Sequence, residues 1–293
     1  MQELLERTYL NQVQGLIRLL RPKQWVKNGF VAAPLIFSGG FLDFHAIERT
    51  AVAVLLFCLA ASATYILNDL HDVEDDRKHP KKSKTRPIAS GLVSPASAWV
   101  LLTAIIGLLT ASWFVLPSIM WIITVYMGVT LAYTFFLKQQ PVIDLFTVSI
   151  GFVLRVYAGA VALEVPVSSW MFVTTLCLAL YLAAIKRRQE HRQAGTASRK
   201  VLEKYTVKLL DYYAEMSATG ALLFYSMFVL SSKPELVLTI PIVLFGLFRY
   251  AYIVDIKEDG ESPTDALLAD WPLIITIAVW IASCLYLFTK YHT

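Results

Sequence analysis

Long apolar runs constrain this sequence more than any other feature. A membrane-spanning helix needs about 20 consecutive apolar residues. Of the 293 residues, 57% are apolar and 16% are charged, whereas a soluble domain carries roughly 25% charged residues. The sequence therefore predicts an all-α integral membrane protein and excludes a disordered chain. Nine apolar segments are expected to span the bilayer, at 25–42, 47–67, 96–115, 118–137, 145–163, 170–185, 212–230, 236–254 and 271–288.

The basic residues predict the orientation of these spans. With the N-terminus in the cytoplasm, 22 of the 26 Lys and Arg residues fall in cytoplasmic segments or near the cytoplasmic ends of the spans. Short cytoplasmic loops carry the Lys/Arg excess of membrane proteins. We therefore expect a multi-pass protein of the cell (inner) membrane whose active surface faces the cytoplasm. The net charge of +4 is too small to indicate nucleic-acid binding.

The chain has no separate soluble region, so we expect a single membrane domain over 1–293. Residues 1–20 mix charged and amide side chains with Leu and Ile, which is typical of an amphipathic helix on the membrane surface. Two charged cytoplasmic loops, 68–95 and 186–211, stand at matching places in the two halves of the chain. The three cysteines lie inside apolar runs and are interpreted as small core residues.

An acidic cluster follows the second span directly. Asp69, Asp72 and Asp76 are spaced i, i+3 and i+7, which puts three carboxylates on one face if the helix continues. Their mutual repulsion costs stability unless a cation lies among them, and hard oxygen ligands suit Mg²⁺, which also binds substrate phosphates. Asn68 joins them at a membrane depth where polar residues are usually functional. The alternative is a solvated acidic helix end.

A basic stretch continues the same loop. Lys82 and Arg86 are candidate ligands of a diphosphate or another anion. Pro87 and Gly91 fix the backbone around Arg86, which gives that residue the stronger case. The alternative for each lysine is that it serves membrane orientation alone.

The motif Asn68-Asp69-x-x-Asp72-x-x-x-Asp76 resembles the first aspartate-rich motif of the UbiA-type prenyltransferase superfamily. The resemblance implies a nine-helix membrane bundle with a cytoplasm-facing central cavity, in which a diphosphate substrate is held through Mg²⁺.

Further motifs make the resemblance closer to one branch of that superfamily. Its enzymes transfer 5-phosphoribose from phosphoribosyl diphosphate to a polyprenyl phosphate of decaprenyl type and release diphosphate. In the resembled branch the product supplies arabinose donors for cell-wall polymers. The motifs are Arg21-Pro-Lys23-Gln-Trp25-Val-Lys27-Asn28, His79-Pro80, Arg86-Pro-Ile-Ala-Ser-Gly91, Val142-Ile-Asp144, Gly151-Phe-Val-Leu-Arg155, Lys186-Arg187-x-x-Glu190 and Arg249-Tyr250-Ala251.

The end of the sixth span favours a phosphoribosyl donor over a prenyl donor. Superfamily members that bind prenyl diphosphate usually carry a second aspartate-rich motif here, whereas this chain has Lys186 and Arg187 with one carboxylate, Glu190. Lysine and arginine bind an anion directly. We therefore expect the aspartates to hold the diphosphate through Mg²⁺, and Lys186 and Arg187 to hold the remote 5-phosphate. The alternative is again membrane orientation.

Four further assignments concern the spans. Lys23 and Lys27, beside the first span, are expected to contact either phosphate, with Lys27 among the catalytic residues. Asp144 and Arg155 are 11 residues apart and share a helix face. They form either a buried ion pair or, in the alternative, Arg155 contacts a phosphate. Tyr133 is expected to line the cavity, or to belong to the core.

The expected chemistry needs little acid–base assistance, because the second pKa of a phosphate monoester is about 6. Catalysis then depends on positioning and on neutralising the leaving group. Two other functions remain open: an aromatic prenyltransferase of the same superfamily, and a transporter or lipid-binding protein without catalysis. The lipid chain length, the number of Mg²⁺ ions and a homo-oligomeric state are left open too.

Overall fold

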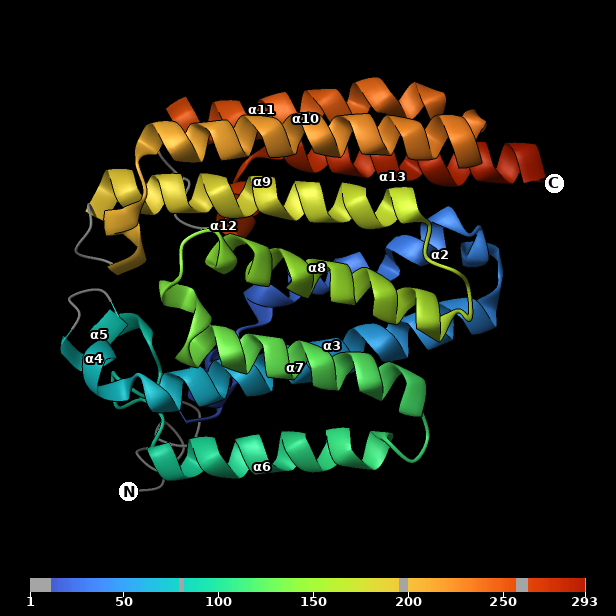
Figure 1. Ribbon diagram of the computed structural model, residues 1–293. Helices are drawn as coiled ribbons and strands as arrows, with labels where there is room; N and C mark the ends of the chain where they lie inside the picture. The colour runs from blue at the N-terminus through green and yellow to red at the C-terminus, as the bar shows by residue number, and fades with distance from the viewer. Residues whose placement is uncertain (1–11, 79–81, 195–199, 257–262, 293) are drawn as a thin grey trace.

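The computed structural model describes residues 12–78, 82–194, 200–256 and 263–292. Long helices run side by side along the molecule, and no strand occurs in the described part of the chain (Figure 1). Residues 12–20 are helical. The elements in the first half of the chain are η1 (Pro22–Ala32), α2 (Ala33–Phe37), η2 (Gly40–Leu42), α3 (Phe44–His71), α4 (Val73–Lys78), α5 (Lys82–Thr85), α6 (Pro95–Ser112), α7 (Pro117–Phe135), η3 (Leu137–Gln139) and α8 (Ile143–Ala162).

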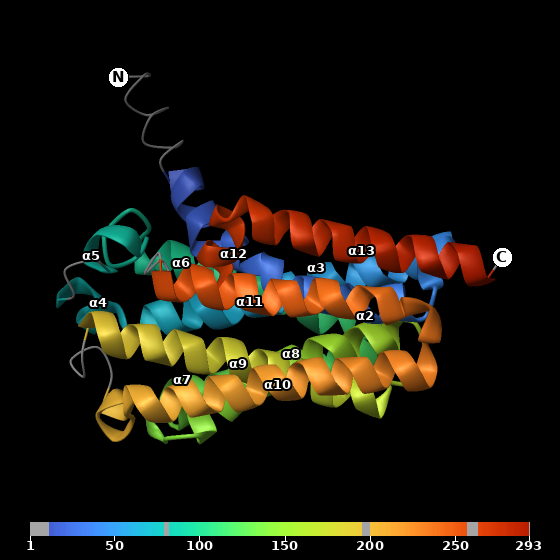
Figure 2. The ribbon, with the colours of Figure 1, turned by 90° about the horizontal axis from the view of Figure 1, so that it is seen from above.

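The second half of the chain adds a further layer of helices on the α8 side. Its elements are α9 (Ser169–Ala194), η5 (Lys200–Lys204), α10 (Val207–Ser232), η6 (Pro234–Thr239), α11 (Ile240–Ile256), α12 (Pro263–Ala269) and α13 (Trp271–His292). In both views, α4, α5 and the C-terminal end of α9 lie at the same end of the bundle (Figure 2). We call this the aspartate end, because Asp69, Asp72 and Asp76 lie there.

Eight of the nine predicted spans are confirmed as helices long and apolar enough to cross a membrane. They are α3, α6, α7, α8, α9, α10, η6 with α11, and α13. Many large apolar side chains on these helices are exposed. In a membrane such side chains would face lipid rather than water. Local signals set their starts: Asp43 and Thr206 accept backbone N–H groups at the starts of α3 and α10, and Pro95 and Pro117 occupy the first turns of α6 and α7.

The predicted span 25–42 is helical but broken into η1, α2 and η2. Pro34 and the Gly39–Gly40 pair interrupt it, and Gly39 has φ +78°. Packing against α8 holds this broken segment in place. The η1 backbone lies directly on α8 at Gly159, where an added Cβ would stand 1.9 Å from the Val31 carbonyl oxygen.

Candidate active site

The aspartate motif straddles a one-residue interruption between α3 and α4. Asp72 caps α3 with ψ near 10°, yet helical hydrogen bonds continue across it, from Asp72 N–H to Asn68 O (2.9 Å) and from Asp76 N–H to Asp72 O (2.8 Å). The predicted common face is therefore largely preserved. Asp69 and Asp76 are each 2% exposed, and Asp72 is half-buried.

Asp69 is the centre of this site. One carboxylate oxygen, Oδ1, accepts hydrogen bonds from the guanidinium groups of both Arg21 and Arg86. The other oxygen, Oδ2, is buried and has no hydrogen-bond partner among the described residues. Two arginines against one carboxylate leave a surplus positive charge, and they leave one buried oxygen that a cation would satisfy.

Local backbone geometry brings the two arginines to Asp69. Arg21 has φ +55°, a left-handed conformation that turns the chain just before Pro22, and its guanidinium lies 4.8 Å from the centre of the Tyr65 ring. Arg86 lies in the turn after α5, and buried Pro87 follows it. The contact of Arg21, 48 residues from Asp69, was not predicted because no local spacing reveals it.

The other two aspartates also have cationic neighbours. Lys82 Nζ lies 3.1 Å from Asp76 Oδ1, and Lys138 Nζ lies 3.9 Å from Asp72 Oδ2. His71 Nδ1 is 2.7 Å from Asp72 Oδ1. Among the described residues, no three His, Cys, Asp or Glu side chains are gathered so that they could hold a metal ion by themselves. The expected three-carboxylate cluster is thus not formed here, because each carboxylate has a basic partner.

Magnesium remains compatible with these residues. Mg²⁺ is usually held by one or two carboxylates, with water and substrate phosphates completing its coordination. Asp69 supplies an unpartnered buried oxygen, and half-buried Asp72 supplies a second carboxylate three residues later. The donor set therefore fits a magnesium ion that arrives with a phosphate-bearing ligand.

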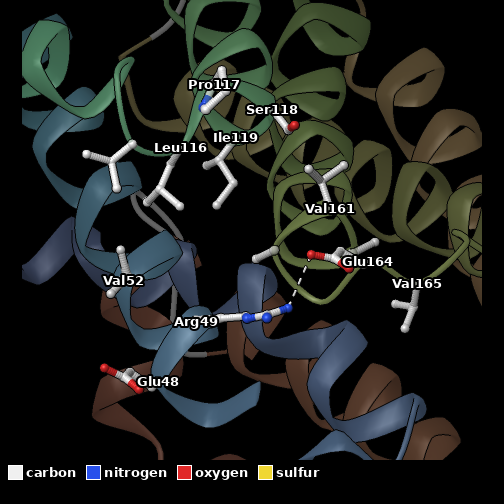
Figure 3. Close-up of a pocket in the computed structure, with 13 residues that line it drawn as sticks. Glu48, Arg49, Val52, Leu116, Pro117, Ser118, Ile119, Val161, Glu164 and Val165 are labelled. Atoms are coloured by element: carbon white, nitrogen blue, oxygen red, sulfur yellow. Dashed lines mark hydrogen bonds and ion pairs between the residues drawn. The ribbon is translucent and has the colours of Figure 1, made fainter. Parts of the chain in front are cut away.

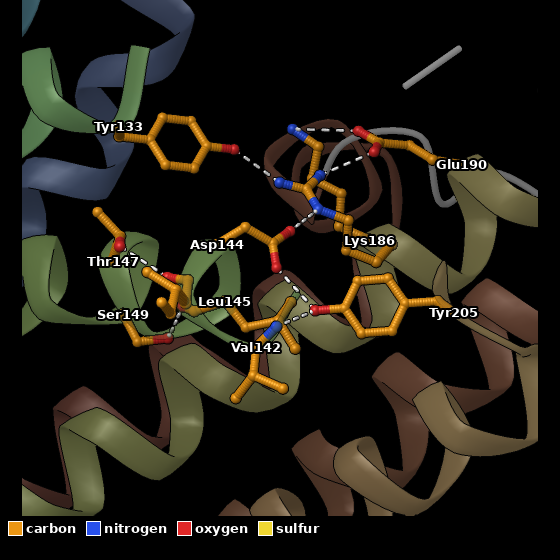
Figure 4. A network of polar contacts seen from close by, with 11 residues as sticks. Tyr133, Val142, Asp144, Leu145, Thr147, Ser149, Lys186, Glu190 and Tyr205 are labelled. Carbon is orange, nitrogen blue, oxygen red and sulfur yellow. Dashed lines mark hydrogen bonds and ion pairs between the residues drawn. The ribbon is translucent and has the colours of Figure 1, made fainter. Parts of the chain in front are cut away.

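A second polar network lies where α7, α8 and α9 meet (Figure 4). Arg187, 3% exposed, is at its centre. The arginine donates to Asp144 Oδ2 from Nε, and to Glu190 Oε2 and the Tyr133 hydroxyl from its two terminal nitrogens, each at 2.7 Å. Lys186 Nζ lies 3.9 Å from Glu190 Oε1. All the nitrogens of this guanidinium are engaged by protein.

Tyr205 completes the network from the segment between η5 and α10. Its hydroxyl donates to Asp144 Oδ1 at 2.7 Å and accepts the Val142 N–H at 2.6 Å (Figure 4). Burial raises the pKa of Tyr205, so its hydroxyl stays protonated and remains a donor. No signal in the sequence pointed to Tyr205, because its partners are more than 60 residues away.

The interpretation of Asp144 and Arg155 as an ion pair is wrong. They share a face of α8, but 11 residues separate them by about 16 Å along the axis. Asp144 pairs with Arg187 instead. In the described part of the chain, no carboxylate lies within ion-pair distance of Arg155.

Arg155, 4% exposed, is bound by neutral groups instead. Its guanidinium donates to Asn28 Oδ1 (2.8 Å), to the Gly151 carbonyl (2.7 Å) and to the Tyr126 hydroxyl (3.0 Å). Three aromatic rings surround it at 4.8–5.7 Å from their centres. Such cation–π contacts contribute roughly 1–2 kcal/mol each when desolvated.

The remaining predicted site residues differ in exposure. Asn68 and Lys27 are half-buried, and Lys23 is exposed. His79 lies outside the described residues. The predicted loop 186–211 is largely helical, because α9 continues to Ala194.

Arg188 is a buried residue that was not among the predicted site residues. It bridges Asp211 of α10 and Asp255 of α11.

Two hollows are plain in the structure, and neither is lined by the aspartates. A pocket of about 820 Å³ lies among the start of α3, the α6–α7 turn and the end of α8, with Arg49 and Glu164 paired at 3.3 Å across it (Figure 3). An apolar groove of about 410 Å³ runs between α8 and α9. The cytoplasm-facing cavity at the aspartate end stays a prediction.

Comparison with known proteins identifies relatives along almost the whole chain. The model of the UbiA prenyltransferase family matches residues 30–269. A decaprenyl-phosphate phosphoribosyltransferase from Mycobacterium tuberculosis is 37% identical, over 93% of this chain and 94% of the relative. The enzyme of the same description from Mycolicibacterium smegmatis is 36% identical, over 93% and 92%.

Solved structures share the fold. A UbiA homolog from Archaeoglobus fulgidus, bound to GPP and Mg²⁺, superposes with a TM-score of 0.70 at 19% identity, covering 94% of this chain and 99% of its own. A digeranylgeranylglyceryl phosphate synthase gives a TM-score of 0.65 at 16% identity, over 94% and 98%.

Proposed function

Because the chain belongs to the UbiA prenyltransferase family, we propose that it carries out a group transfer to a polyprenyl phosphate at the aspartate end of the bundle. The donor is 5-phosphoribosyl 1-diphosphate, the acceptor is a polyprenyl phosphate of decaprenyl type, and diphosphate is released. The observation that carries the proposal is the contrast in charge between two helix ends that lie at the same end of the bundle. A carboxylate is the buried centre on α3, and an arginine is the buried centre on α9.

The diphosphate of the donor binds beside Asp69. Arg21 and Arg86 already meet at one oxygen of this carboxylate, so together they present more positive charge than the carboxylate neutralises. Arginine guanidinium groups bind phosphate oxygens through two parallel hydrogen bonds. The two side chains therefore orient the leaving group and stabilise the charge it gains.

Asp69 and Asp72 would hold magnesium. Bound there, Mg²⁺ supplies Lewis-acid stabilisation of the departing diphosphate. The buried unpartnered Oδ2 of Asp69 supports this assignment, and Mg²⁺ is bound in the Archaeoglobus homolog of the same fold. Asp76, paired with Lys82, keeps that lysine beside the same site.

The 5-phosphate of the donor is assigned to Lys186. Lys186 is half-buried on α9. Arg187, whose guanidinium is engaged by Asp144, Glu190 and Tyr133, acts as a positioning residue that fixes this turn of α9. This refines the expectation that Lys186 and Arg187 hold the phosphate together.

The transfer itself exchanges one C–O bond for another. An oxygen of the lipid phosphate attacks C1 of the ribose, the bond from C1 to the diphosphate oxygen breaks, and its electron pair leaves with diphosphate. The lipid phosphate is already largely deprotonated at neutral pH, because its second pKa is about 6. The protein therefore needs to position both substrates and needs no general base.

In the membrane, η1 and α2 together form a ninth, broken span beside the eight long helices. All nine belong to one domain over 1–293. The excess of Lys and Arg supports an orientation in an inner membrane with the N-terminus and the aspartate end on the cytoplasmic side. The charged segments 68–95 and 186–211 then face the aqueous donor, while the acceptor enters from the bilayer.

The test is an assay in detergent or lipid with radiolabelled phosphoribosyl diphosphate, decaprenyl phosphate and Mg²⁺. Label should appear in the lipid fraction, and chelation of Mg²⁺ should abolish it. Label transfer from a prenyl diphosphate to an aromatic acceptor, without transfer from phosphoribosyl diphosphate, would replace this function with an aromatic prenyltransferase. Binding of both substrates without any turnover would favour a transporter or lipid-binding protein.

A further inference from the structure

Farther along the helices from the aspartate end, the interior of the bundle carries positive charge. Asn28 contacts both Cys58 of α3 and Arg155 of α8. Cys58 lies 11 residues from Asp69, and Arg155 lies 11 residues from Asp144, which is about 16 Å along each helix. Arg155 is therefore well inside the bundle, roughly half-way along a 30 Å hydrocarbon core.

Lys27 lies between these two levels. Arg21 contacts Asp69, and Asn28 contacts Arg155, so η1 runs from the first level to the second. Lys27 is half-buried, and within the described ranges its ammonium group has no hydrogen bond and no ion pair. The charges of Arg155 and Arg21 repel it, and the charge of Asp265 attracts it.

Arg155 and Lys27 together form a cationic site whose direct contacts include no carboxylate. Within the described part of the chain, the groups that contact the Arg155 guanidinium are an amide, a carbonyl, a hydroxyl and aromatic rings. These groups hold a guanidinium in place without cancelling its charge. An ionisable group at this depth is costly and usually serves a substrate, and two such groups together suit a dianion.

The direction of the reaction identifies the dianion. If the displacement at C1 inverts, the nucleophile and the leaving group lie on opposite sides of that carbon. The diphosphate departs at Asp69, on the cytoplasmic side, so the nucleophile approaches from the deeper side. The acceptor also reaches the site from the bilayer, because its chain is apolar.

We propose that Lys27, with Arg155 beneath it, binds the phosphate monoester of the polyprenyl acceptor. The assignment rests on the proposed function and extends it to a residue-level site for the nucleophile. Lys27 contacts the phosphate, and Arg155 contributes charge from below while it holds Asn28 and thereby η1. The 5-phosphate of the donor has the same monoester chemistry, and the test distinguishes the two sources.

The test compares Lys27→Met with Lys27→Arg and with Lys208→Met, a matched substitution of an exposed lysine at the start of α10. Direct binding to the full-length protein in detergent is measured with farnesyl phosphate and, separately, with ribose 5-phosphate, so that turnover is not needed. Lys27→Met should weaken farnesyl phosphate about tenfold to a hundredfold. Lys27→Arg should keep most of the wild-type affinity for farnesyl phosphate, and Lys208→Met should bind it as the wild type does.

In the steady state, Lys27→Met should raise the KM for the polyprenyl phosphate and leave the KM for phosphoribosyl diphosphate unchanged. Unaltered binding of farnesyl phosphate in Lys27→Met would overturn the proposal, and so would a loss confined to ribose 5-phosphate, which would assign Lys27 to the donor. These outcomes are independent of the assay above, in which the wild type itself would fail if the proposed function were wrong.

Discussion

The charged ends of α3 and α9 lie at the same end of the bundle, but their central buried charges have opposite signs. On α3 the buried charge is a carboxylate, Asp69, and the arginines around it are partly exposed. On α9 the buried charge is an arginine, Arg187. Glu190 of the same helix contacts it, and the other polar groups of the network come from α7, α8 and the segment before α10. One end leaves a buried oxygen without a partner, whereas the other engages every nitrogen of its central guanidinium.

This difference suits the Asp69 side to bind substrates and the Arg187 side to hold helices together. Incomplete pairing at Asp69 leaves capacity for a cation and an anion, so substrates can complete the site. Complete pairing at Arg187 leaves that side chain little capacity for substrate, but it joins α7, α8, α9 and the segment before α10 into one rigid unit. Substitutions on the two sides should accordingly affect different quantities.

The largest effect is expected for Asp69→Asn. The amide keeps the shape of the side chain but removes its charge, so Arg21 and Arg86 face no carboxylate and the proposed magnesium ligand is lost. Loss of a metal that stabilises the transition state is equivalent to several kcal/mol, so turnover in the labelled-lipid assay should fall at least about a thousandfold. Asp75→Asn, an exposed carboxylate on α4, is the control and should keep wild-type turnover. Near-normal turnover of Asp69→Asn at limiting Mg²⁺ would refute the metal assignment.

Arg187→Met should act on stability. It leaves Asp144 buried without its cationic partner, a loss that typically costs about 3 kcal/mol of unfolding free energy. Thermal unfolding in detergent should show a clear drop in Tm. The double variant Asp144→Asn/Arg187→Met should recover part of it, because no unpaired buried charge remains. An unchanged Tm for the single variant would show that the network does not brace the helices.

Lys186→Ala should act on donor affinity alone. Loss of one charge-assisted contact to a phosphate predicts a rise of about tenfold in the KM for phosphoribosyl diphosphate. The KM for the polyprenyl phosphate and the Tm should change little. Lys208→Ala provides a surface comparison. If the donor KM of Lys186→Ala equals that of the wild type, the 5-phosphate binds elsewhere.

Tyr205→Phe is expected to have the smallest effect. It removes one hydrogen bond to Asp144 and one from the Val142 N–H, while the Asp144–Arg187 pair persists, so the cost is about 1 kcal/mol of stability. Turnover should stay within about threefold of the wild type. The exposed Tyr212→Phe serves as the reference. A large loss of turnover at unchanged Tm would mean that Tyr205 contributes to the reaction directly.

The sequence predicted the features that depend on neighbouring residues. Apolar runs of sufficient length identified eight of the helices, and the spacing of Asp69, Asp72 and Asp76 predicted a shared face across the α3–α4 junction. Pro34 and the Gly39–Gly40 pair marked the segment that is broken. These signals are local, because each lies within one or two helical turns.

What the sequence could not provide was the identity of distant partners. Asp144 and Arg155 share a face of α8, but 11 residues of helix already separate them by about 16 Å, so the spacing itself argued against this pair without indicating the true partner. The actual partner of Asp144 is 43 residues away, and Arg21 reaches Asp69 from 48 residues away. Such pairs are decided by how helices are arranged in space.

The Asn28–Arg155 hydrogen bond has a consequence for biosynthesis, because 127 positions separate its two residues. At about 5–20 residues per second, a ribosome needs roughly 6–25 seconds to make the intervening chain. During that interval the η1 segment, which carries Lys27 and Asn28, has neither the guanidinium of α8 nor the glycine surface at Gly159 to settle against. The η1 segment therefore cannot reach its final contacts until α8, the fifth long apolar segment, has been made.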